Sequence, residues 1–123
     1  MNTIGAVCLA IFLIVTGVAH FVVPGYFRTL VPAWLGRAGL LVAATGAAEI
    51  VVGALVLVPA SRSAGSWAAA ALITGYLVSH VDALWHARAD RPRKLDRPAG
   101  ALARLAVNGV YIAWAVAVAR YTA

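Results

Sequence analysis

The sequence predicts an all-α fold: a membrane-embedded antiparallel four-helix bundle with a short interfacial helix between spans one and two. The chain is 63% hydrophobic and 11% charged, whereas soluble domains carry about 25% charged residues. Four apolar stretches are each about 20 residues long, so as helices they match the ~30 Å core of a bilayer. They cover residues 3–23, 40–58, 66–86 and 101–120.

The connections between these stretches are short, so neighbouring spans should run antiparallel. A soluble domain of 123 residues could not hide four helices that are apolar on all sides. We therefore expect residues 1–123 to form a single transmembrane domain.

The first span, residues 3–23, ends before Pro24. No Lys or Arg precedes it and no small-residue cleavage site follows it, so we expect a retained helix rather than a signal peptide. In the following loop, residues 24–39, apolar side chains recur at helical spacing, which predicts a short amphipathic helix in the membrane interface. These side chains are Phe27, Leu30, Val31 and Trp34.

The second span, residues 40–58, places Gly46, Glu49 and Gly53 on one helix face. Small residues mark the surfaces where helix backbones approach each other in a membrane. Asp82 of the third span lies on a similar stripe of small residues. Both acids are therefore expected on packing faces rather than on faces that contact lipid.

The net charge of +6 is concentrated in the loops of residues 24–39 and 87–100. The positive-inside rule places these loops in the cytoplasm and both termini outside. Loop 87–100 has no interleaved aromatic residues, so attraction to anionic lipid explains its charge better than nucleic-acid binding does. The single cysteine, Cys8, excludes an intramolecular disulfide and a Cys-x-x-Cys redox pair.

Glu49 lies near the middle of a span that has no other ionisable residue. A charged carboxylate at that depth costs roughly 3 kcal/mol, and intramembrane acids usually serve a function. Two interpretations stay open. Either Glu49 is a protonated side chain that only joins helices, since burial favours the neutral acid, or it takes part in chemistry.

The remaining polar side chains of the spans gather in the same half of the predicted bundle. We expect them to line a pocket that opens to the cytoplasmic side, with His20 and Glu49 as candidate catalytic residues. The candidate binding residues are His80, Asp82, Asn108 and Tyr111.

Several of these residues also have structural interpretations. His20 could simply form a hydrogen bond to Thr16 or to a backbone carbonyl, and Asn108 could form a hydrogen bond that joins two helices. Asp82 is expected to form an ion pair with Arg104, or with His86 four residues later.

Three segments carry a family resemblance. Gly17–Phe21 has the pattern G-x-x-H-F, Thr45–Ile50 has the pattern [ST]-G-x-x-E-[IL], and Leu57–Pro59 forms a Pro-terminated turn followed by Arg62. Together they resemble the DoxX-like family of small bacterial four-helix membrane proteins. His80 stands where that family commonly has Asn, so only His20 and Glu49 are carried over as functional positions.

The resemblance implies a bacterial inner-membrane protein associated with redox biology, either quinone-linked or involved in oxidative stress. The bound partner would then be a quinone or another hydrophobic small molecule, with Glu49 as proton relay. Whether the chain is an enzyme stays open.

Two other hypotheses remain. His20, Glu49 and His80 come from three spans and could hold a metal or a haem. Alternatively, the chain is a non-catalytic subunit of a larger membrane complex, a homo-oligomer or a small transporter, because its small-residue stripes could also serve association between chains.

Overall fold

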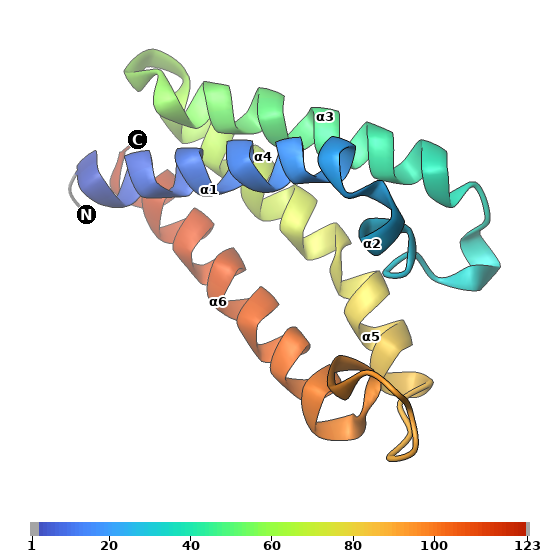
Figure 1. Cartoon of the computed structure of the whole chain (residues 1–123). Helices are drawn as coiled ribbons and strands as arrows, with labels where there is room; N and C mark the ends of the chain where they lie inside the picture. Colours follow the sequence, from blue (N-terminus) through green and yellow to red (C-terminus); the bar gives the residue numbers. More distant parts are fainter. Residues whose placement is uncertain (1–2, 123) are drawn as a thin grey trace.

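The computed structural model describes residues 3–122, and all the regular structure in this range is helical. Six α-helices follow one another within the described range (Figure 1): α1 Thr3–Val22, α2 Pro24–Arg28, α3 Ala38–Leu57, α4 Arg62–Gly75, α5 Leu77–Trp85 and α6 Pro98–Tyr121. Short 3₁₀ turns lie at Ala33–Leu35, Pro59–Ser61 and Lys94–Asp96. The all-α prediction is confirmed.

Within the described range, four helical segments are long and apolar enough to cross a membrane, as the hydropathy predicted. They are Thr3–Val22, Ala38–Leu57, Pro59–Trp85 and Pro98–Tyr121. Proline sets several boundaries, because its fixed φ and missing N–H suit the first helical turn. Pro24, Pro59 and Pro98 each begin a helical element.

The predicted third span is two helices, α4 and α5, which meet at Tyr76. Gly75 weakens the helix at this point. The Thr74 hydroxyl donates to the Ala70 carbonyl oxygen at 2.6 Å, a contact that often bends helices.

The interfacial segment is also less regular than predicted. Its helix α2 ends at Arg28, and a separate 3₁₀ turn, Ala33–Leu35, follows Pro32. Proline at position 32 offers no N–H for a continued helix and disfavours helical backbone at Val31. The expected single amphipathic helix is therefore replaced by two short turns.

Helix α1 packs closely along α3, and α4 packs along α6. Glycine makes the first contact possible: a Cβ added to Gly46 would lie 2.6 Å from His20 Cβ, and one added to Gly17 would lie 2.8 Å from the Gly46 carbonyl oxygen. As the sequence predicted, the small residues of α3 face a neighbouring helix.

The two helix pairs converge near the termini and diverge towards α2 and α5 (Figure 1). Buried apolar side chains fill the converging end; they include Leu9, Leu13, Val56, Ala69 and Val118. The diverging end holds the cavity that forms the candidate site.

Candidate functional site

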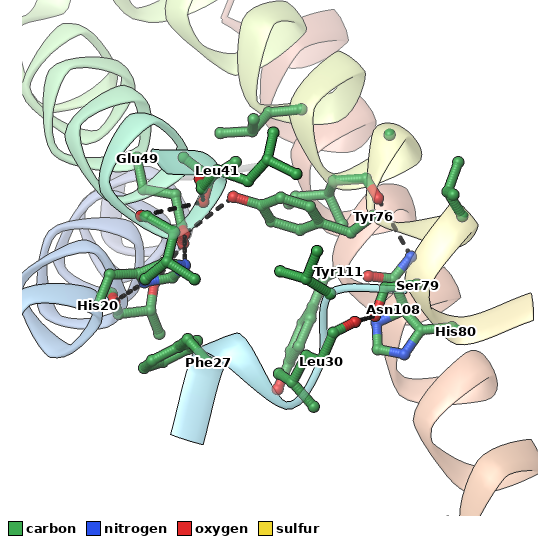
Figure 2. A pocket seen from close by; sticks show the side chains of 18 of the residues that line it. His20, Phe27, Leu30, Leu41, Glu49, Tyr76, Ser79, His80, Asn108 and Tyr111 are labelled. Carbon is green, nitrogen blue, oxygen red and sulfur yellow. Dashed lines mark hydrogen bonds and ion pairs between the residues drawn. The ribbon is translucent and has the colours of Figure 1, made fainter. Parts of the chain in front are cut away.

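A cavity of about 520 Å³ opens between the helix pairs, and residues 27–35 cover part of it. Its lining is mainly aliphatic and aromatic. Polar side chains occupy two walls (Figure 2): Glu49, His20 and Tyr76 meet on one, while Ser79, His80 and Asn108 lie on the other. An apolar cavity of this size with a few fixed polar groups is typical of small-molecule sites.

Glu49 is the centre of the first wall and is only 4% exposed. Its Oε1 lies 2.6 Å from the Thr16 hydroxyl. Its Oε2 accepts a hydrogen bond from the Tyr76 hydroxyl at 2.9 Å and lies 3.1 Å from His20 Nε2. Helices α1, α3 and α4–α5 thus converge on one buried carboxyl group, which satisfies its oxygens without water.

The neighbours of His20 define where its protons lie. Its Nδ1 lies 2.6 Å from the Thr16 carbonyl oxygen. A carbonyl can only accept, so Nδ1 must carry a hydrogen. In the neutral ring Nε2 is then a bare acceptor, and it faces Glu49 Oε2. The contact requires a proton between Nε2 and Oε2, held by either residue, and the pair is neutral overall in both cases.

The imidazole ring of His20 is held from several sides. It stacks on Phe27, with ring centroids 3.9 Å apart and an interplanar angle of 17°. Gly46 lies so close to the Cβ of His20 that no larger residue fits at position 46. His20 is therefore a fixed buried group, 7% exposed, rather than a side chain that samples several rotamers.

The opposite wall contains an unsatisfied polar atom. Asn108 is 4% exposed and donates to the Ile73 carbonyl oxygen at 3.2 Å, and the Ser79 hydroxyl donates to the Leu30 carbonyl oxygen. Nδ1 of His80 is buried but has no hydrogen-bond partner within residues 3–122. A buried nitrogen without a partner is costly, and the side chain of Asn108 interacts with the same ring.

The structure brings most of the sequence-predicted residues to this cavity. His20, Glu49, His80, Asn108 and Tyr111 all line it. Tyr111 contributes an aromatic surface, tilted against Phe12 with centroids 4.6 Å apart, and its predicted ligand contact stays a prediction.

Asp82 does not line this cavity, and its predicted binding role stays a prediction. Its Oδ1 accepts a hydrogen bond from Trp34 Nε1 at 3.0 Å and lies 3.3 Å from His86 Nδ1. Of its two predicted ionic partners, the structure selects His86; Arg104 instead lies 3.7 Å from Asp96. The 3₁₀ turn that carries Asp96 packs on the start of α6 and so brings this other acid to Arg104.

Sequence reasoning missed the role of Tyr76. Its hydroxyl donates to Glu49 Oε2, a contact between distant segments that residue spacing does not reveal. The sequence did indicate Thr16 as a possible partner of His20, four residues later on one helix face, and the Thr16 carbonyl oxygen lies 2.6 Å from His20 Nδ1.

No group of three or more His, Cys, Asp or Glu side chains gathers as a metal site within residues 3–122. His20 and Glu49 are already engaged with each other, and His80 belongs to the opposite wall (Figure 2). The donor set of the metal hypothesis is therefore divided between the two walls.

Fold and site together define a class: a helical protein with four membrane-length segments and a buried histidine–glutamate pair facing an apolar cavity. The model of a family described as a domain of unknown function, DUF8561, matches residues 9–119. The chain belongs to this family. No curated protein and no solved structure matches it.

Proposed function

We propose that this chain is a multi-pass protein of the bacterial cytoplasmic membrane, folded as an antiparallel four-span bundle and related to the DoxX-like proteins. The four apolar helical segments support embedding in a membrane. In the proposed orientation the basic loops, residues 24–39 and 87–100, lie in the cytoplasm and the termini outside. The start of α1 and the end of α6 lie close together and away from both loops (Figure 1), which supports this topology.

Within that setting, the protein binds a quinone and serves as a redox-associated accessory. The observation that carries this proposal is the His20–Glu49 pair, which shares a proton at 3.1 Å on the wall of an apolar cavity. A quinone has an apolar ring and two carbonyl oxygens that accept hydrogen bonds and take up protons on reduction. The cavity offers apolar surface for the ring and a proton beside one carbonyl.

The second wall supplies a hydrogen bond to the other carbonyl oxygen of the quinone. His80 lines the cavity and its Nδ1 lacks a hydrogen-bond partner, so a rotation of the ring that brings this nitrogen to the cavity surface would let it donate to a ligand oxygen. The two walls face each other across the cavity (Figure 2), which suits a ring with oxygens on opposite sides. This chain binds and orients the ring and places one proton beside it; the reduction itself is not assigned to this chain.

The test is a calorimetric titration of the purified protein in detergent with duroquinone, a methylated benzoquinone, and with durene, the same ring without carbonyls. We expect saturable binding of duroquinone at least tenfold tighter than binding of durene, because a hydrogen bond of about 1.4 kcal/mol corresponds to tenfold. Short-chain ubiquinone and menaquinone analogues then identify the preferred ring.

Glu49→Gln and His80→Phe should each weaken duroquinone binding about tenfold. Asp90→Asn is the matched acid-to-amide control, since Asp90 is exposed and outside the cavity lining, and it should bind like the original protein. Equal affinity for duroquinone and durene, or full affinity in both cavity variants, contradicts the proposal.

A further inference from the structure

A second, smaller cavity of about 190 Å³ lies beside the first, and Leu30, Val31 and Ser79 line both. Ligand pockets for whole drug-sized molecules measure about 300–1,000 Å³, so this one suits a single chemical group. Its lining is markedly charged, with Asp82, His86, Arg91, Arg93, Asp96 and Arg104.

Arg104 is the least satisfied of these charges. Its side chain is only 10% exposed, and its ionic contact within the described range is with Asp96 Oδ1 at 3.7 Å. A guanidinium has five N–H donors. A nearly buried cation with one long contact is costly unless an anion completes its surroundings.

The neighbouring carboxylates are engaged elsewhere. Asp96 accepts two hydrogen bonds from Arg93, at 2.8 and 3.3 Å. Asp82 is bonded to Trp34 and lies beside His86. The cavity lining contains three arginines and two aspartates, so with His86 neutral it has one positive charge in excess. This excess charge lies at Arg104 and Arg91.

We propose that this cavity binds a phosphate group, with Arg104 as the principal ligand and Arg91 as a second one. Guanidinium forks match phosphate oxygens in geometry and charge. Basic pockets between helices on the cytoplasmic side of membrane proteins bind anionic headgroups. The phosphate comes either from a lipid headgroup or from free phosphate. The site is separate from the His20–Glu49 wall, so it does not depend on quinone binding.

The test uses the full chain in dodecyl maltoside micelles, titrated calorimetrically with dioctanoyl phosphatidic acid, dioctanoyl phosphatidylcholine and inorganic phosphate. Phosphatidic acid should bind saturably and at least tenfold more tightly than phosphatidylcholine, whose choline cancels the charge. Inorganic phosphate that binds as tightly identifies free phosphate as the source, and binding of the lipid alone identifies a headgroup site.

Arg104→Gln should lose at least tenfold in affinity for the tighter probe, whereas Arg88→Gln should lose nothing. Arg88 is the matched control because it carries the same charge, is exposed, and lies outside the cavity lining. If Arg104→Gln does not elute as a single folded species, Arg91→Gln replaces it, with an expected loss of at least threefold. No saturable binding, undiminished binding in the tested cavity variant, or an equal loss in Arg88→Gln overturns the proposal.

Discussion

Nδ1 of His20 lies 2.6 Å from the carbonyl oxygen of Thr16, one helical turn earlier in α1. This contact determines how the pair with Glu49 works. It assigns a hydrogen to Nδ1, so the other nitrogen and the carboxyl group must share a second proton. A backbone atom thus sets the tautomer of His20, much as carbonyl groups do for histidines at metal sites.

Nitrogen-15 NMR of the imidazole tests this assignment directly. We expect His20 to show a protonated Nδ1 at neutral pH, with Nε2 either hydrogen-bonded to the acid or protonated. The Glu49→Gln variant should keep Nδ1 protonated, because Thr16 is unchanged. A neutral ring with a bare Nδ1 and a protonated Nε2 would contradict the proposed arrangement.

Two substitutions of Glu49 should differ in stability. In Glu49→Gln the amide nitrogen, in the place of Oε2, can donate to His20 Nε2 and to the Tyr76 oxygen, while the amide oxygen keeps the contact with Thr16. The free energy of unfolding should therefore change by less than about 1 kcal/mol. Alanine leaves the buried polar neighbours of Glu49 without a partner and should cost about 3 kcal/mol. Chemical unfolding in detergent measures both; equal losses would show that the carboxyl contacts add little.

The α1–α3 contact should not tolerate a methyl group. In Gly46→Ala the new Cβ would lie 2.6 Å from His20 Cβ, which forces the helices apart at an expected cost of about 1–3 kcal/mol. Gly109→Ala is the control, because a Cβ there meets nothing within 4 Å and alanine favours helix. Thermal unfolding of both variants makes the comparison. Equal stability of the two would mean that the helices separate without cost.

The Arg93–Asp96 pair should produce a small acid sensitivity. Hydrogen bonding from Arg93, together with the nearby charges of Arg93, Arg104 and Arg91, lowers the pKa of Asp96. Because the folded-state pKa is below the ordinary value of about 3.9, the stabilisation is complete above that value. It is lost as the pH falls through the lower folded pKa.

We therefore expect Asp96→Asn to flatten the pH dependence of Tm below about pH 4. Raising the ionic strength should do the same to the original protein, since exposed pairs are screened by salt. Thermal melts at low and high salt supply the measurement. An unchanged pH profile in Asp96→Asn would show that this pair has no such role.

The sequence was a good guide to the parts that depend on one helix at a time. Hydropathy located the four long segments, because an apolar run is a local property. The spacing of Gly46, Glu49 and Gly53 identified the packing face of α3, since helix periodicity fixes which side chains share a side. The contact between His20 and Thr16 also follows from local spacing.

Contacts between segments were harder to foresee. Tyr76, at the junction of α4 and α5, donates to Glu49, and Trp34, in the turn after Pro32, donates to Asp82. In both cases a small change in backbone direction decides which partner a polar side chain meets. Such choices arise from three-dimensional packing and not from residue spacing.

Because the two helix pairs diverge from one close-packed end, a small rotation at that end would produce a larger displacement at the other. The pivot of such a rotation is the close-packed end around Leu9 and Val56, and α1 extends 13 residues beyond Leu9 to Val22, a length of about 20 Å at ~1.5 Å per residue. A rotation of about 3° at the pivot would move the far end of α1 by about 1 Å over that length. A rotation of this size would widen the cavity for a bulkier ligand without rearranging the side chains at the pivot.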